Sequence, residues 1–183
     1  MQDGGSGWGG GGGGPKGGAQ GRRGGYTAEQ QISRNADGTY TFNGDIPDAD
    51  INEDPVIKEA GEDVSVKIGL RKNGTVLARE GGLYDHDTNF ANLDVYEADA
   101  TSKLEAYRDS HQAEANSLRN GVLSQSQGKE YARRIRSSKD PETTSKAIGQ
   151  EIANLAATAE IKAQSADYAI QALKRSVAAA KKR

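Results

Sequence analysis

The sequence contains no cysteine, and only one methionine and one tryptophan occur in its 183 residues. The absence of cysteine excludes disulfide bonds and thiolate chemistry, and it leaves the redox compartment undetermined. No run of about 18 apolar residues occurs, which excludes an ordinary membrane-spanning helix. The first residues are rich in glycine, where a secretory signal peptide would carry an apolar stretch. We therefore expect a soluble protein, or one delivered without such a signal.

Large apolar side chains are also scarce. Leu, Ile, Val and Phe make up 28 of the 183 residues, about 15%. This lies below the roughly 20% under which a chain has difficulty building its own core. Alanine is abundant and lets helices pack at close approach, and the net charge is only -2. The composition predicts a chain whose folding depends on partners.

The small net charge conceals a division along the chain. Residues 1–35 carry a net +2, residues 36–100 a net -10, and residues 101–183 a net +6. An acidic middle beside a basic end favours head-to-tail contact between subunits, or a basic surface that faces an acidic partner. The alternative is that these charges belong to ordinary solvated helix faces.

Residues 1–25 form a glycine-rich segment, which we predict to be a flexible tail. Trp8 is its one large side chain, so we predict that Trp8 binds a partner. Arg22 and Arg23 precede two glycines and Tyr26, and this is a single step of the kind that RNA-binding tracts repeat many times. These two arginines are candidate partner-binding residues.

Residues 26–84 are predicted to form a small acidic segment with two β-hairpins. The first has its turn at Asp37-Gly38 and continues into the β-prone run 39–42. The second has alternating apolar residues over 64–70, a turn at Asn73-Gly74 and a return strand at 76–78. An acidic loop separates the two hairpins.

Residues 85–183 are predicted to be helical, so the fold class is mainly α, with a coiled coil or helical bundle. One apolar stripe runs from Phe90 to Val122 and a second from Ile148 to Ala180, each with heptad spacing and one four-residue stutter. Asp140 followed by Pro141 predicts the start of the last helix. Whether the stripes associate within or between chains stays open. The predicted association residues are Leu104, Tyr107, His111, Leu118, Ile148, Ile152, Leu155, Ile170, Leu173 and Val177.

No pattern in the sequence indicates catalysis or a cofactor. His86 and His111 lie in different predicted elements, and no phosphate-binding motif occurs. Asp48, Asp50, Asn52 and Glu59 match positions 1, 3, 5 and 12 of a calcium-binding loop, but Glu53 replaces the glycine that the turn needs. We therefore predict a non-enzymatic protein without a metal site, in which this segment is a solvated acidic loop.

A basic cluster lies before the last helix. Arg133, Arg134 and Arg136 are candidate residues for binding a partner, nucleic acid included. They would also interact favourably with the dipole at a helix C-terminus. The second interpretation needs fewer assumptions.

Two families resemble parts of the chain. Residues 3–8, DGGSGW, resemble the glycine-rich translocation segment of nuclease colicins, although this sequence has an extra glycine and no killing domain. The layout of glycine-rich start, short β segment and Ala/Gln/Ser-rich helices is similar to minor structural proteins of tailed phages. This resemblance implies a homo-oligomeric tail, neck or ejection protein that binds other virion proteins, is made in the bacterial cytoplasm and resides in the virion. A bacteriocin-like translocation or receptor-binding module and a nucleic-acid-associated protein are the alternatives.

Overall fold

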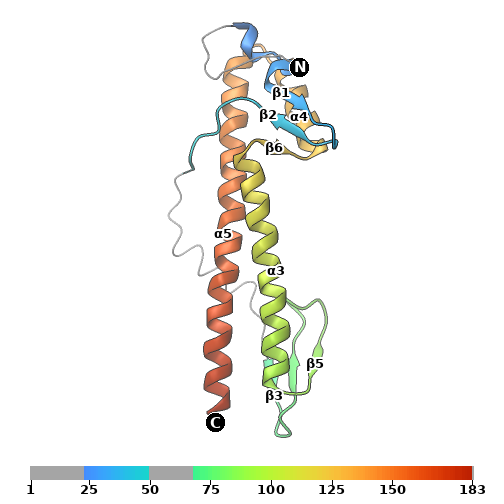
Figure 1. Cartoon of the computed structure of the whole chain (residues 1–183), viewed down its shortest axis with the longest axis vertical. Coiled ribbons are helices and arrows are strands. Elements are labelled where there is room, and N and C mark those ends of the chain that lie inside the picture. The colour runs from blue at the N-terminus through green and yellow to red at the C-terminus, as the bar shows by residue number, and fades with distance from the viewer. Residues whose placement is uncertain (1–22, 50–67, 183) are drawn as a thin grey trace. The chain divides into compact units, whose positions relative to one another are not determined.

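The computed structural model describes residues 23–49 and 68–182, which are mainly helical with two small sheets (Figure 1). They divide into two compact units. The first contains residues 23–48 and 117–154, and the second contains 49, 68–116 and 155–182. The segment 26–84 that the sequence suggested contributes residues up to 48 to the first unit and the hairpin at 68–78 to the second. The segment 85–183 contributes to both units, because the division falls within the long helices α3 (Leu93–Arg119) and α5 (Pro141–Lys181).

In the first unit, a three-stranded antiparallel sheet packs against a helix. The strand order is β1-β2-β6, with Ile32 paired to Phe42 and Thr41 paired to Val122. Helix α4 contacts all three strands and helix α1. Among its described residues, the first unit contains parts of α3 and α5 and six further elements: η1 (Arg23–Tyr26), α1 (Ala28–Gln31), β1 (Ile32–Arg34), β2 (Tyr40–Phe42), β6 (Val122–Leu123) and α4 (Gln125–Arg136).

Local turn chemistry produces the first hairpin, as the sequence predicts. Gly38 has a φ of 90°, which favours glycine, and the Asp37 carboxylate accepts hydrogen bonds from the backbone N–H of Thr39 (2.9 Å) and from its hydroxyl (2.6 Å). The sequence did not predict the third strand. The apolar stripe was extended as helix to Val122, but Gly121 has a φ of 77°, so α3 ends at Arg119 and Val122 lies in β6.

Close backbone approaches fix the packing of the first unit. A Cβ on Gly128 of α4 would lie 2.2 Å from Cγ of Tyr40, and one on Gly149 of α5 would lie 2.1 Å from the carbonyl oxygen of Asp45. The buried apolar side chains of this unit include Ala28, Ile32, Phe42, Leu118, Leu123, Tyr131, Ala132, Ile135, Ile148 and Ile152. Helix α5 starts at Pro141, as predicted, and the Asp140 side chain accepts hydrogen bonds from Thr143.

The second unit combines another three-stranded antiparallel sheet with parts of α3 and α5. Strands β3 (Ile68–Leu70), β4 (Val76–Ala78) and β5 (Thr88–Phe90) follow the order β3-β4-β5. The predicted hairpin with its turn at Asn73-Gly74 is present between β3 and β4, while Val64 and Val66 lie outside the described residues. The sequence did not predict β5. Phe90, which was expected to start the first helical stripe, lies in this strand.

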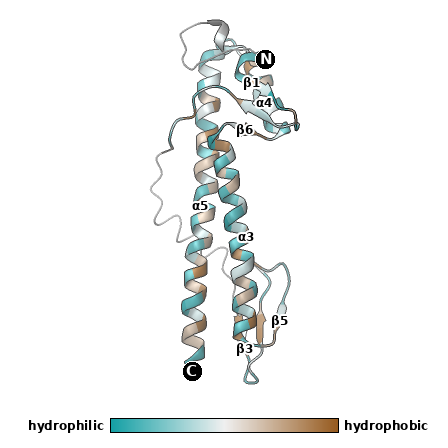
Figure 2. Ribbon diagram, in the orientation of Figure 1, coloured by the Kyte–Doolittle hydropathy of each residue, from teal (hydrophilic) through white to brown (hydrophobic). Residues whose placement is uncertain are grey.

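Apolar contacts hold the sheet of the second unit against α3 and α5. One cluster of buried residues contains Val76, Ala78, Tyr84, Leu93, Tyr96, Ala100 and Val177. Another contains Leu104, Ala169 and Ile170. Helix α5 is mostly pale in Figure 2, because many of its buried positions are alanine rather than larger apolar residues. The scarcity of large apolar side chains is thus met by helix packing through alanine.

Candidate functional site

The two helices of the second unit associate within one chain. Leu104 of α3 packs against Ala169 and Ile170 of α5, and Val177 of α5 joins the cluster around Tyr96. We call these contacts the helical seam. The sequence left open whether the stripes associate within or between chains, and these seam contacts are intramolecular.

Most of the predicted association residues are covered by this chain itself. Leu104, Leu118, Ile148, Ile152, Ile170 and Val177 are buried, and Leu173 is partly buried. Tyr107 and His111 stack edge to face on α3 with ring centroids 4.4 Å apart, and His111 Nδ1 lies 2.9 Å from a carboxylate oxygen of Glu114.

Leu155 is the exception among the predicted association residues, since 41% of its surface is exposed. The sequence pattern stepped three residues from Ile152 to Leu155. In the structure the buried stripe steps four residues, from Ile152 to Ala156, and then continues through Ala159. The stutter, where two four-residue steps follow one another, therefore lies earlier in α5 than predicted, at Ile148, Ile152 and Ala156. Because the buried stripe continues through Ala156, Leu155 faces solvent.

The three predicted partner-binding arginines of α4 already pair with carboxylates of the same unit. Arg134 makes a bidentate contact to Glu151 (2.6 and 3.2 Å), and its guanidinium lies 5.4 Å from the ring centroid of Tyr131. Arg133 pairs with Glu130 at 2.6 Å, and Arg136 with Glu29 at 3.3 Å. The hydrogen bonds that Arg134 and Arg133 donate to Glu151 and Glu130 raise the pKa values of Arg134 and Arg133, respectively.

These three pairs differ in exposure and therefore in what they can do. The side chain of Arg134 is 31% exposed, whereas those of Arg133 and Arg136 are 64% and 61% exposed. Exposed ion pairs contribute little to stability and exchange readily, whereas a bidentate pair that also stacks on a ring has defined geometry. Arg134 thus serves the packing of α4 on α5, and Arg133 and Arg136 are the arginines of this group that a partner could reach.

The other predicted partner-binding residues lie largely beyond the described part of the chain. Trp8 and Arg22 lie outside it, and Arg23 is the first residue of η1. Of the calcium-loop candidates, Asp48 is described, and Asp50, Asn52 and Glu59 are not. Within residues 23–49 and 68–182, no group of three or more His, Cys, Asp or Glu side chains is arranged to hold a metal ion. None of the helices in these two ranges has the length and apolar composition of a membrane-spanning segment.

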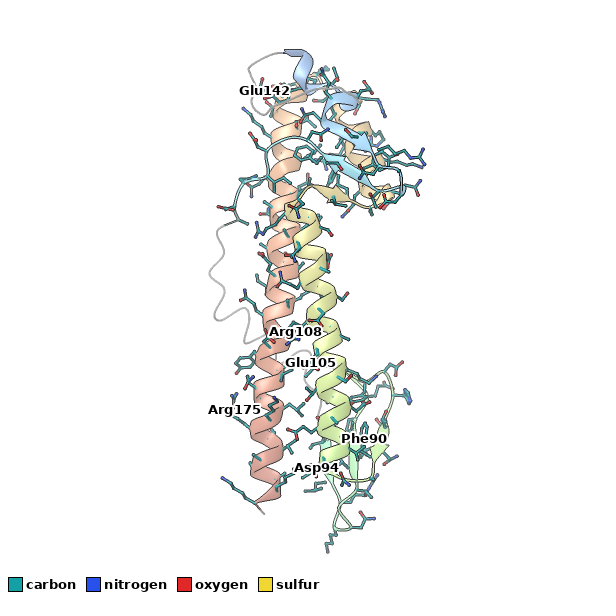
Figure 3. All side chains as sticks on the ribbon, in the orientation of Figure 1. Phe90, Asp94, Glu105, Arg108, Glu142 and Arg175 are labelled. Atoms are coloured by element: carbon teal, nitrogen blue, oxygen red, sulfur yellow. The ribbon has the colours of Figure 1, made fainter. Side chains whose placement is uncertain are left out.

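The second unit contains a polar pocket with a volume of about 450 Å³. One wall is the connection between β4 and β5, together with Phe90 of β5, which is labelled in Figure 3. The other wall is α3, where Asp99 and Lys103 are four residues apart and therefore share a face. The full lining is Gly82, Leu83, Tyr84, Asp85, His86, Thr88, Phe90, Asp99 and Lys103.

A buried tyrosine joins the two walls of this pocket. The Tyr84 hydroxyl donates a hydrogen bond to Oδ2 of Asp99 at 2.7 Å, and the Tyr84 ring stacks edge to face on Phe90 with centroids 5.8 Å apart. Burial, and then the hydrogen bond to Asp99, raise the pKa of the Tyr84 hydroxyl above its ordinary value. Tyr84 therefore stays neutral and acts as a fixed donor, which orients the Asp99 carboxylate.

The rim of the pocket carries charges of both signs. The Lys103 ammonium lies 5.7 Å from the centroid of the Tyr84 ring. Nδ1 of His86 lies 2.6 Å from a carboxylate oxygen of Asp85. This hydrogen bond, the charge of His86 and, to a lesser degree, the charge of Lys103 lower the pKa of Asp85. The rim thus presents hydrogen-bond donors and acceptors side by side.

Sequence reasoning missed this pocket. The Gly81-Gly82 pair by itself indicates only a break in regular structure, and the four-residue spacing of Asp99 and Lys103 is common on solvated helix faces. The isolated backbone bridge between Gly81 and Tyr84, which turns the chain toward α3, has no signal in the sequence beyond the two glycines. No protein-family model, no curated protein and no solved structure matches this chain.

Proposed function

We propose that this chain is a non-enzymatic structural protein of a tailed-phage particle, in which the paired helices serve as a stiff support. The observation that carries the proposal is the construction of α5. Its 41 residues span about 60 Å at 1.5 Å per residue, and its second half pairs with α3 through many alanines. A helix that is paired with a second helix through apolar contacts resists bending, which suits a supporting role.

In-chain pairing changes which surfaces would bind neighbouring subunits. The seam residues are occupied by the chain itself, so an inter-subunit contact would use residues that remain exposed. The large apolar side chains exposed among the described residues are Leu70 (45%), Val95 (47%) and Leu155 (41%). We therefore assign homo-oligomerisation and binding to other virion proteins to the outer faces of the helices and to the N-terminal residues, with Trp8 as the main anchor.

The test is the composition of purified particles. Peptide mass spectrometry of particles from an infected culture should find this chain in a fixed ratio to the tail proteins. Deleting residues 1–25 should leave the helical circular dichroism of the isolated protein unchanged and abolish incorporation, and Trp8→Ala should reproduce much of that defect. Infectious particles of normal composition that lack this chain would contradict the proposal.

A bacteriocin-like binding module is a second candidate. The in-chain seam favours it, because a helical pair that completes its packing within one chain suits a module that acts as a monomer. The two functions differ in whether the chain is present in purified particles, and in whether Trp8 is needed for incorporation into particles or for binding to a target cell. A bacteriocin-like module would bind a periplasmic or surface protein of the target cell through residues 3–8 and would be absent from particles.

A further inference from the structure

The polar pocket of the second unit offers donors and acceptors that the fold itself uses only in part. Oδ2 of Asp99 accepts the hydrogen bond of Tyr84, and Oδ1 is left for another donor. Lys103 forms no ion pair with any described residue, and its ammonium sits over the ring of Tyr84. One carboxylate oxygen and one ammonium group, on the same face of α3, therefore border the pocket.

The charges around the pocket discriminate between classes of ligand. Asp85 and Asp99 would repel an anion, whereas Lys103 would repel a cation. A wholly apolar ligand would strip water from these polar groups without replacing their hydrogen bonds. The pocket therefore suits an uncharged ligand that both donates and accepts hydrogen bonds.

We propose that this pocket binds a neutral saccharide unit. Each sugar hydroxyl donates and accepts, so neighbouring hydroxyls can donate to Asp99 and accept from Lys103 at once. The apolar C–H face of the ring would contact the aromatic side of the pocket at Phe90. A volume of about 450 Å³ lies within the range of small-molecule sites, which is roughly 300–1,000 Å³. This inference goes beyond the structural role and does not depend on it.

The experiment is a titration of the full chain followed by amide NMR shifts. The probes are glucose, galactose, N-acetylglucosamine and rhamnose as free sugars, with glycine and inorganic phosphate as zwitterionic and anionic comparisons. Because the pocket is open and the ligand is small, we expect a Kd on the order of 1 mM for at least one sugar. The shifts should fall on residues 82–90 and on α3 around Lys103.

Two variants test the assigned contacts. Lys103→Met keeps the length of an exposed side chain and removes its donors, and Asp99→Asn keeps an acceptor for Tyr84 and removes the charge. Each should weaken sugar binding about tenfold, the size of one lost charge-assisted hydrogen bond. Lys129→Met, at an exposed position of α4 in the first unit, is the matched control and should leave binding unchanged.

The outcomes separate clearly. Saturable shifts at the pocket that weaken in both pocket variants support the proposal. The proposal is overturned if no sugar gives saturable shifts, if glycine or phosphate binds more tightly than every sugar, or if Lys103→Met binds as well as the parent. Circular dichroism of each variant verifies the fold, which both substitutions should preserve, because Lys103 is exposed and Asp99→Asn still offers an acceptor to Tyr84.

Discussion

Truncation of Leu104 is the sharpest test of the in-chain seam. Leu104 is 2% exposed and packs against Ala169 and Ile170, and its alanine neighbour is too small to fill the space that Leu104→Ala would leave. Buried leucine-to-alanine changes cost about 2–5 kcal/mol, and the partly buried Leu83 and Leu173 nearby allow some collapse. We therefore expect a loss of about 3 kcal/mol, with a fall in Tm on the order of 10 °C.

The matched control is the same substitution on the other predicted stripe. Leu155 is 41% exposed, so Leu155→Ala should change stability by less than about 0.5 kcal/mol. Both leucines lie within helices, and Leu and Ala have similar helix propensities, so the comparison isolates burial. Thermal melts followed by circular dichroism, with urea denaturation for the free energies of unfolding, measure both variants.

Concentration dependence decides whether the seam is intramolecular. A seam within one chain gives a Tm that does not change with protein concentration, whereas a seam between chains gives a Tm that rises with concentration. Because the outer-face contacts between subunits are proposed for the assembled particle, we expect the isolated parent protein and isolated Leu104→Ala each to keep the same Tm over a hundredfold range. A Tm that rises with concentration, or a Leu155→Ala variant as unstable as Leu104→Ala, would refute the in-chain arrangement.

Three further results are expected. Gly128→Ala should destabilise the first unit by about 1–3 kcal/mol, because its Cβ would lie 2.2 Å from Cγ of Tyr40, while Gly69→Ala, with open space around it, should fold normally; urea denaturation compares them. Burial raises the pKa of Tyr96 from 10.0 to about 12, so the stability it contributes is complete below about pH 10 and is lost as the pH rises through about 12; a flat profile of unfolding free energy over that window would contradict this. Calcium should change neither the Tm nor the circular dichroism, because Glu53 occupies the position where a calcium loop needs glycine, and a rise of several degrees would show the opposite.

The elements that the sequence predicted correctly are those set by neighbouring residues. Asp37-Gly38 and Asn73-Gly74 each place a glycine with positive φ at a tight turn, and both hairpins form around them. Asp140 before Pro141 starts α5 where the capping pattern placed it. In each case the chemistry that fixes the structure lies within a few positions of the chain.

The elements that the sequence missed depend on distant residues. Strand β6 has two residues and exists because Val122 pairs with Thr41, which lies 81 positions earlier. Leu155 fits the heptad spacing, but its exposure depends on which side of α5 the rest of the chain covers. The next residue, Ala156, is fully buried, so an error of one position in the stripe exchanges a buried residue for an exposed one. The pocket is likewise assembled from a connection and a helix face that no local pattern joins.

Folding also explains the division of charge along the chain. Residues 36–100 and 101–183 carry net charges of -10 and +6, but the described residues of the two units carry nine bases with eight acids and ten bases with eleven acids. Each unit is nearly neutral because it takes residues from both the acidic and the basic part of the sequence. The ion pairs Arg108–Asp167, whose arginine is labelled in Figure 3, and Lys181–Asp94 join α3 to α5 in this way.

This neutralisation removes one argument for an external partner. The acidic middle and basic end were expected to indicate contact between subunits, a basic surface that faces an acidic partner, or ordinary solvated helix faces. In the structure, each unit contains residues of both parts of the sequence. Exposed ion pairs of this kind add little stability individually. The opposite net charges of residues 36–100 and 101–183 nevertheless attract these two parts of the chain to each other, whereas parts of like charge repel. Most of the remaining acidic excess lies in residues 50–67, which have six acids and two bases. A partner that recognises this protein by charge alone would therefore be basic, and it would be directed to that segment rather than to the helices.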